Sequence, residues 1–255
     1  MRRFPPEFAV LLSRRGQALL ERGYRDAPRV FHSAETPLAL LTGVLDRKWA
    51  ECCRDLLDRA MYDHVRPVES PIPAETITGM RRNYAELLPK TMRFKTACLA
   101  SRSSLAYRAA SRIGLPQMLQ SESLAVFAER VTGLNLQRDR WIQVILYEPG
   151  DYAGPHNDHH PEHVSARHGY VDVHISLTSP GVSGQYLVCE HGGHFSRQYS
   201  VALNGSVAVY RLPFWHYTTP LRAKRSMGEE ARRWLLLASF EIDRNVAPRG
   251  SGKAS

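Results

Sequence analysis

A ten-residue stretch at 154–163, GPHNDHHPEH, concentrates four histidines and two acidic residues. His156 and Asp158 lie two positions apart, a spacing that puts both side chains on one face at the end of a β-strand. A third ligand has to come from elsewhere, and His216 follows a strand-like run, SVAVYRL. Two imidazoles and one carboxylate form the facial triad of non-haem Fe(II) oxygenases, whereas a structural zinc site would need thiolates.

The remaining HHPEH run (159–163) has a different interpretation. Loop histidines are more often solvated than metal-bound, and the proline excludes the helical HExxH motif of metalloproteases. A rival site built from His159, Glu162 and His163 has no recognised ligand spacing. We expect this loop to lie at the mouth of the metal site, where His159, His160 and Arg167 would contact substrate.

The elements that would position these residues change character near residue 138. Before it, apolar residues at helical spacing predict helices over 6–23, 46–63, 74–88, 103–113 and 121–132. After it, alternating β-branched and aromatic residues predict strands over 141–150, 170–180, 185–193, 200–213 and 232–242. Asp46 is the expected N-cap of the second helix, and Gly133 is the expected end of the last one.

These elements predict one integrated α+β domain that is mainly β. Its core would be a sandwich or barrel at 139–243, and the mainly helical part at 1–138 would pack outside it. A small, polar and basic segment at 244–255 is expected to be disordered.

Composition narrows the function classes. The chain has 255 residues, 43% of them hydrophobic, and a formal charge of +9. The basic residues are scattered with no aromatic-interleaved stripe, which makes nucleic acid an unfavoured partner. No apolar run approaches the length of a membrane span, and the N-terminal one is too short for a signal sequence. Four cysteines without CxxC spacing indicate a reducing compartment, so we expect a cytoplasmic protein.

The second half resembles the 2-oxoglutarate- and Fe(II)-dependent dioxygenase superfamily, in its prolyl-hydroxylase-like branch. YEPGDYAGPHND (147–158) is similar to that family's Tyr-x-Pro-Gly…Pro-His-x-Asp segment. SGQYLVCEHGG (183–193) is similar to its Gly-Gly-x-Leu strand, with Gln185 in place of the second glycine. LNGSVAVYRLPFWHYTTPL (203–221) and RRWLLLASF (232–240) are similar to its Gly…His…Pro-Val segment and its closing arginine strand.

The resemblance implies a double-stranded β-helix, the jelly-roll or cupin-like fold. It also implies Fe(II) held by His156, Asp158 and His216. The cosubstrate 2-oxoglutarate would chelate the metal, and its distal carboxylate would pair with an arginine of the last strand, for which a planar guanidinium is suited.

Two adjacent arginines compete for this role. Arg233 is favoured over Arg232, because it puts Leu235 and Leu237 on the inward face and Trp234 outward. This arginine lies 17 residues after His216, further than is usual in the family, so Arg222 and Arg225 remain fallback candidates.

Two further groups of residues complete the predicted site. Tyr147 and Gln143 share a strand face and could bind the cosubstrate, although Tyr147 is equally well interpreted as a core residue. Trp215 and Arg222 lie in the 214–230 segment, which would form the other wall of the substrate site.

The predicted activity is hydroxylation of a small molecule, an amino acid or specialised metabolite. It would consume O2 and release succinate and CO2, with ascorbate as an optional reductant. The positive charge is also compatible with a substrate that is tethered to an acidic carrier protein. The alternatives are a protein substrate, an inactive regulatory relative, or a cupin-like protein that binds or isomerises without redox chemistry. The cupin pattern has a glutamate that this chain does not match.

Overall fold

A computed structural model describes residues 2–32, 37–71, 90–158 and 169–243 of the chain. Within them, an antiparallel sheet of eleven strands folds over on itself. Its order is β1 (Leu38–Leu41), β10 (Ser206–Leu212), β6 (Tyr170–Thr178), β13 (Arg233–Ile242), β4 (Leu136–Tyr147), β3 (Thr91–Cys98), β5 (Tyr152–His156), β11 (His216–Thr218), β8 (Tyr186–His191) and β9 (His194–Ser200), with β2 (Arg66–Pro71) paired to β3.

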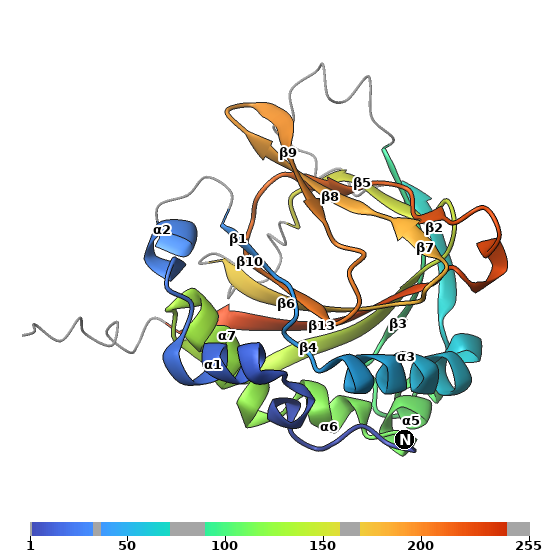
Figure 1. The fold of residues 1–255 in the computed structure, drawn as a ribbon, viewed down its shortest axis with the longest axis horizontal. Helices are drawn as coiled ribbons and strands as arrows, with labels where there is room; N and C mark the ends of the chain where they lie inside the picture. The colour runs from blue at the N-terminus through green and yellow to red at the C-terminus, as the bar shows by residue number, and fades with distance from the viewer. Residues whose placement is uncertain (1, 33–36, 72–89, 159–168, 244–255) are drawn as a thin grey trace, which may run out of the picture.

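Strand β3 connects two layers of this sheet, because it pairs with β4 on one side and with β5 on the other. Figure 1 shows β4, β13 and β6 in one layer and β5, β8 and β9 in the opposite layer. A separate small ladder joins β7 (Val182–Gly184) and β12 (Arg222–Ala223). The result is a barrel-like jelly roll, which confirms the predicted fold class.

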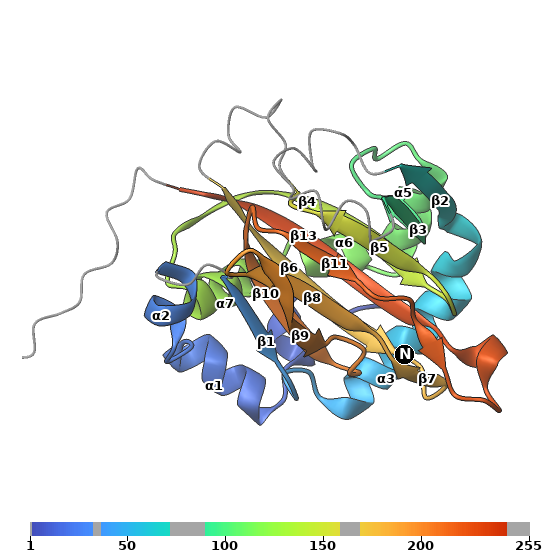
Figure 2. The same ribbon diagram turned by 90° about the horizontal axis from the view of Figure 1, so that it is seen from above.

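The helices gather outside one layer, beneath β4, β13 and β6 (Figures 1 and 2). They are α1 (Arg14–Arg22), α2 (Ala27–His32), α3 (Arg47–Met61), α5 (Leu105–Arg112), α6 (Leu115–Leu119) and α7 (Glu122–Thr132). Short 3₁₀ turns occur at η1 (Phe8–Leu11), η2 (Tyr62–His64) and η5 (Gly228–Glu230). One face of that layer is therefore covered by helices, and the other face is turned toward the second layer.

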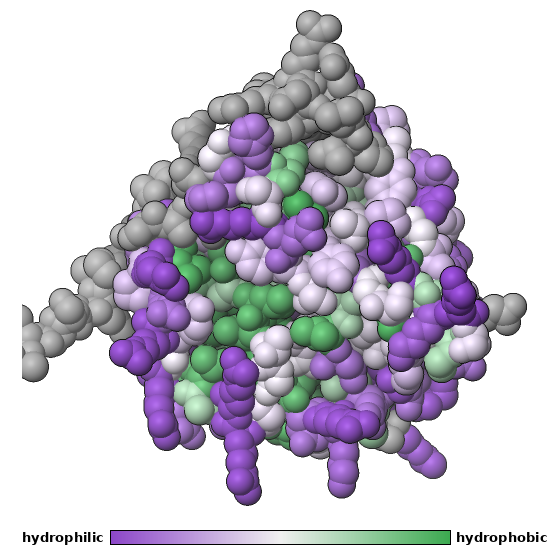
Figure 3. All heavy atoms as spheres, turned by 45° about the horizontal axis from the view of Figure 1, so that its top comes forward, coloured by the Kyte–Doolittle hydropathy of each residue, from purple (hydrophilic) through white to green (hydrophobic). Residues whose placement is uncertain are grey.

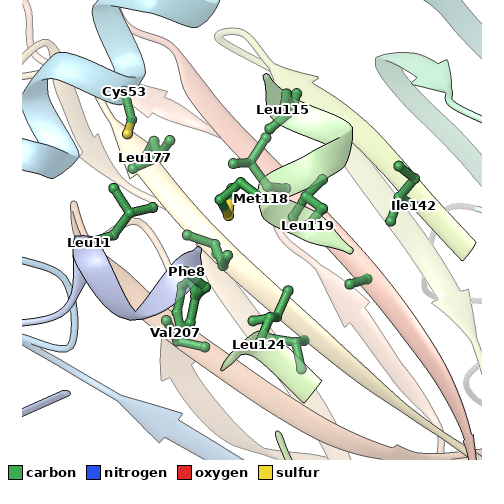
Figure 4. Close-up of a cluster of buried hydrophobic side chains, with 14 of the residues drawn as sticks. Phe8, Leu11, Cys53, Leu115, Met118, Leu119, Leu124, Ile142, Leu177 and Val207 are labelled. Atoms are coloured by element: carbon green, nitrogen blue, oxygen red, sulfur yellow. The ribbon is translucent and has the colours of Figure 1, made fainter. Parts of the chain in front are cut away.

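The main hydrophobic core lies between these helices and the sheet. Figure 4 shows Met118 and Leu119 of α6 and Leu124 of α7 beside Leu177 of β6 and Val207 of β10, all buried. Each fully buried side chain of this size contributes roughly 1.5–3 kcal/mol by leaving water. This packing fixes the sheet on which the polar residues of the opposite face are displayed.

Local sequence signals account for the helix ends. The Asp46 side chain accepts hydrogen bonds from the backbone N–H groups of Lys48 and Trp49, as predicted for an N-cap. Helix α7 ends at Gly133, whose φ of 72° is the left-handed conformation that glycine adopts most readily. The predicted helix at 74–88 and tail at 244–255 lie outside the described residues.

The part before residue 138 also contributes strands β1, β2 and β3, which the sequence analysis did not predict. Each is short, and each is held by pairing with a strand distant in the chain or with its neighbour in the sheet. Local periodicity is weak in such segments, since long-range hydrogen bonds decide their conformation. The helical part is thus interleaved with the sheet as well as packed on it.

Figure 3 shows hydrophilic side chains projecting around one face of the molecule, with an apolar area between them. Across the described ranges, every helix is too short or too polar to cross a membrane.

Candidate metal centre and adjoining cavity

His156, Asp158 and His216 lie together, with one ligand atom from each within 4.8 Å of the others. The Nε2 atom of His156 is 3.3 Å from one carboxylate oxygen of Asp158, and that of His216 is 3.3 Å from the other. The two imidazole rings are 4.4 Å apart, centroid to centroid. Two nitrogen donors and one oxygen donor thus converge on one point, the arrangement predicted from the sequence.

Strand pairing explains why residues 60 positions apart meet. His156 ends β5, His216 begins β11, and the two residues face each other in the antiparallel register. Asp158 follows β5 with a φ of 53°, an uncommon conformation for a residue with a side chain, although aspartate tolerates it better than most. The Tyr170 hydroxyl donates to the Asp158 carbonyl and helps to hold this turn.

Backbone carbonyls orient both imidazoles. The Nδ1 atom of His156 is 2.6 Å from the Gly154 carbonyl oxygen, and that of His216 is 2.9 Å from the Phe214 carbonyl oxygen. Each Nδ1 therefore carries the proton and donates, which leaves each Nε2 lone pair directed toward Asp158. This is the usual arrangement of histidines that bind metals.

The charges of the three groups suit a cation. Burial alone would raise the pKa of Asp158, but the two imidazoles hold it well below its ordinary range. Burial lowers the pKa of His156, yet the Asp158 carboxylate beside it makes the net shift upward. Burial and the neighbouring His156 lower the pKa of His216. An ionised carboxylate between two imidazoles is a donor set that fits Fe(II).

A cavity of about 160 Å³ adjoins the three residues, and the buried Arg233 lines it. The Arg233 side chain donates from Nε to Ser176 Oγ at 2.8 Å and from Nη1 to Gln185 Oε1 at 2.9 Å. Burial lowers its pKa, and the described part of the chain gives it no carboxylate partner. A buried cation without an anion is costly, which indicates that an anionic ligand completes this end of the cavity.

Arg232 lies on the other side of β13, away from the cavity. Its guanidinium is 3.8 Å from Asp58 and 3.7 Å from Glu148, and it stacks over the Tyr62 ring at 4.4 Å. Strand alternation explains the difference, since adjacent residues point to opposite faces. Of the two arginines considered from the sequence, the structure brings only Arg233 to the metal ligands.

Tyr147 and Gln143 both line the cavity, at different distances from Arg233 along the sheet. Tyr147 faces Arg233 in the register, with its ring 5.5 Å from the guanidinium carbon. Burial raises the pKa of Tyr147 to about 12, so its hydroxyl remains a donor. Gln143 faces Leu237, four residues further along β13, and its amide donates to Thr96 at 2.7 Å. The structure therefore places Tyr147 beside Arg233 and Gln143 away from it.

The remaining predicted residues do not line the cavity in the described structure. His159, His160 and Arg167 lie outside the described residues. Trp215 is half-buried and absent from the cavity wall, and Arg222 is exposed on β12. The reason for the last two is that Trp215 precedes β11, whose His216 and Thr218 face the cavity, while β12 pairs with β7 at the surface.

The polar residues of the cavity wall that were not predicted from the sequence include two titratable residues of β6. Asp172 and His174 of β6 both line it. The sequence YVDVHISLT does carry a signal, because polar residues alternate there with Val171, Val173 and Ile175. That alternation predicts two different faces, but it does not tell a cavity wall from a solvent-facing surface.

Comparisons with solved structures agree on the fold. The carbocyclase SnoK of nogalamycin biosynthesis, described as non-heme and alpha-ketoglutarate-dependent, superimposes with a TM-score of 0.54 and 13% identity over 88% of this chain and 86% of that one. A 2OG-Fe(II) oxygenase family oxidoreductase from Burkholderia pseudomallei superimposes with a TM-score of 0.53 and 14% identity over 94% of this chain and 93% of that one. A prolyl hydroxylase from Trichoplax adhaerens, in complex with a hypoxia inducible factor peptide, superimposes with a TM-score of 0.51 and 12% identity. The match covers 89% of this chain and 91% of that one.

No family model matches the chain, and no curated protein matches it. The structural similarity shows the jelly-roll fold of the 2-oxoglutarate and Fe(II) oxygenases, which confirms the fold expected from the motifs. At these identities it says nothing more about substrate or partner.

Proposed function

We propose that the chain is a non-haem Fe(II)- and 2-oxoglutarate-dependent oxygenase that hydroxylates a small molecule. One observation carries the proposal: the cavity that adjoins the three metal ligands also contains a buried arginine without a carboxylate partner among the described residues. A metal triad alone would suit many reactions. The triad together with a site for a dianionic cosubstrate suits this one.

His156, Asp158 and His216 would hold Fe(II), and Arg233 would bind the distal carboxylate of 2-oxoglutarate. The Tyr147 hydroxyl, beside Arg233, would supply a further hydrogen bond to that carboxylate. The bound iron and cosubstrate would supply the oxidising chemistry, consuming O2 and releasing succinate and CO2, with ascorbate as an optional reductant. The protein's own task is to orient these groups and to exclude water from the cavity.

We favour a small molecule because the cavity is a recess lined by both apolar and polar side chains beside the three candidate ligands. An amino acid or a specialised metabolite suits such a recess, whether free or presented on an acidic carrier protein. The similar structures include one bound to a peptide, so a protein substrate is the competing outcome of a substrate screen. A cupin-like protein without redox chemistry is the other competing outcome, and it would form no succinate.

Anaerobic titration tests the proposal. Fe(II) and 2-oxoglutarate added together should produce the weak metal-to-ligand charge-transfer band of the chelate, and admission of O2 should yield succinate. Asp158→Ala should give neither signal. His64→Ala, which removes a histidine from η2, away from the cavity, serves as the matched control and should behave like the wild type. Absence of both the band and succinate from the wild-type protein would refute the oxygenase assignment.

A further inference from the structure

The cavity has a second polar feature, formed by Asp172 and His174 on β6. Their neighbours Val171, Val173 and Ile175 point the other way and are buried against the helices. Asp172 and His174 therefore belong to the inward face, and both line the cavity that contains the metal ligands. None of the interactions described for Fe(II) or for 2-oxoglutarate uses them.

Asp172 is a buried carboxylate with unused bonding capacity. Its residue is 6% exposed, and its Oδ1 atom is buried without a hydrogen-bond partner. Its Oδ2 atom is 3.6 Å from the Nε2 atom of His174, beyond hydrogen-bond distance, and that nitrogen also lacks a partner. Within the described ranges no lysine or arginine pairs with Asp172. Buried polar atoms are nearly always satisfied, so these two point to a ligand.

The strand register places this pair away from Arg233. Arg233 faces Thr178 of β6, whereas Asp172 faces Ser239, six residues further along each strand. At the usual rise of a β-strand this separates the two charged residues by roughly 20 Å. The cavity wall thus carries a cation toward one end and an anion toward the other.

The Tyr210 ring connects this pair with the candidate metal ligands. It faces Asp172 in the register, and its centroid is 4.4 Å from that of His174 and 6.0 Å from that of His216. A molecule held at Asp172 would therefore lie in the same cavity as the candidate metal ligands, toward the end away from Arg233.

We propose that Asp172 binds a protonated amine of the substrate, with His174 as a second polar contact. This inference rests on the proposed function and narrows its substrate class to small molecules with an ammonium group. An ammonium N–H donated to Oδ1 would form a charge-assisted hydrogen bond and neutralise the carboxylate. A cation bound at one end and a dianion at the other would also keep the two ligands from exchanging places.

Binding of a simple amine tests the inference without turnover. The probe is hexylammonium, with hexan-1-ol as its neutral counterpart, added to full-length protein loaded with Mn(II) and 2-oxoglutarate. Paramagnetic Mn(II) at the triad enhances the relaxation of protons on a nearby bound probe. We expect enhancement for hexylammonium at concentrations where hexan-1-ol shows none. Asp172→Asn should weaken that binding about 10- to 100-fold, the loss expected for a hydrogen bond to a charged group.

The control variant is Glu51→Gln, which removes the same charge from an exposed position on α3 and should bind hexylammonium like the wild type. Asp172→Ser provides a second test of the position if Asp172→Asn does not fold. Equal binding of the ammonium and the alcohol, or equal hexylammonium binding by the wild type and both Asp172 variants, would overturn the inference. Failure of Mn(II) to bind the wild-type triad would instead overturn the proposed function, and the relaxation of bulk water reports that separately.

Discussion

Arg233 and Gln185 are joined by a hydrogen bond of 2.9 Å between Nη1 and Oε1, and both side chains are buried. Gln185 occupies the position where the resemblance leads one to expect a glycine. Its amide nitrogen donates to the backbone carbonyls of Thr219 and Asp151, at 3.1 and 3.3 Å. Gln185 therefore ties the guanidinium to the segment after β11, and it fixes where an anion can meet Arg233.

We expect Gln185→Leu to weaken 2-oxoglutarate binding by about tenfold, because Arg233 loses a partner that orients it. The unfolding free energy should also fall by about 1–3 kcal/mol, since a buried donor is left unpaired. Gln185→Glu should weaken 2-oxoglutarate binding further, because the new carboxylate competes with the cosubstrate for Arg233. Titration of the charge-transfer band and urea denaturation measure the two effects. Tighter cosubstrate binding by Gln185→Glu would contradict this account.

The assignment of Arg233 over Arg232 gives a second prediction. Arg233→Lys keeps the charge but loses the bidentate geometry of the guanidinium and its hydrogen bonds to Ser176 and Gln185. The affinity for 2-oxoglutarate should therefore fall by about tenfold or more. Arg232→Lys is the matched control, and it should leave that affinity unchanged because its side chain faces Asp58 and Glu148. Isothermal titration of 2-oxoglutarate into the Mn(II)-loaded protein measures both. A larger loss of affinity for Arg232→Lys than for Arg233→Lys would mean that Arg232 binds the cosubstrate.

The grouping of the three candidate metal ligands was predictable from the sequence because its signals are local. His156 and Asp158 have the i, i+2 spacing of one strand face, and His216 follows a recognisable strand. The choice between Arg232 and Arg233 also followed from alternation along β13. In each case the residue type and its phase in a strand were sufficient to propose a position.

Other parts of the site depend on contacts that no local pattern contains. Strand β3 pairs with both β4 and β5, and this long-range pairing closes the layers around the cavity. Asp172 and His174 alternate with apolar residues along β6, as polar residues do in any strand that has one polar face. Whether that face meets solvent or a cavity is decided by the opposite layer of the sheet, which contributes His156, His216 and Thr218 to the cavity wall. The three candidate metal ligands could therefore be named from the sequence, whereas the opposite wall of the cavity could not.

The backbone conformation of Asp158 provides a third prediction, because its φ is 53°. Asp158→Ala and Asp158→Gly both remove the carboxylate, so both should lose Fe(II) or Mn(II) binding. The metal-free Gly variant should nevertheless be more stable than the Ala variant by about 1 kcal/mol, since glycine adopts positive φ without steric cost. Metal analysis after dialysis and thermal unfolding measure the two properties. Equal stability of the two variants would show that the turn relaxes when the carboxylate is removed.

The fourth prediction concerns the pH dependence of stability, which depends on Glu148. Its carboxylate accepts from Tyr62 at 2.9 Å and lies 2.6 Å from the Lys95 ammonium, on the outer side of β4. Burial alone would raise the pKa of Glu148, but the hydrogen bonds from Lys95 and Tyr62 lower it below its ordinary value. Since the folded-state pKa is the lower one, its stabilisation is present above the unfolded-state pKa and is lost as pH falls through the folded-state pKa.

Glu148→Gln should therefore lower the unfolding free energy by about 1 kcal/mol near pH 7. This deficit should shrink as pH falls below the ordinary glutamate pKa of about 4.3 and vanish below the lowered folded-state pKa, where wild-type Glu148 is neutral. Urea denaturation of both proteins across this range gives the difference directly. Glu51→Gln is the control, because the Glu51 side chain is 42% exposed and, among the described residues, pairs with Arg47 four residues away, so its removal should have little effect at any pH. A deficit for Glu148→Gln that stays constant with pH would show that Glu148 stabilises the fold through packing rather than through its charge.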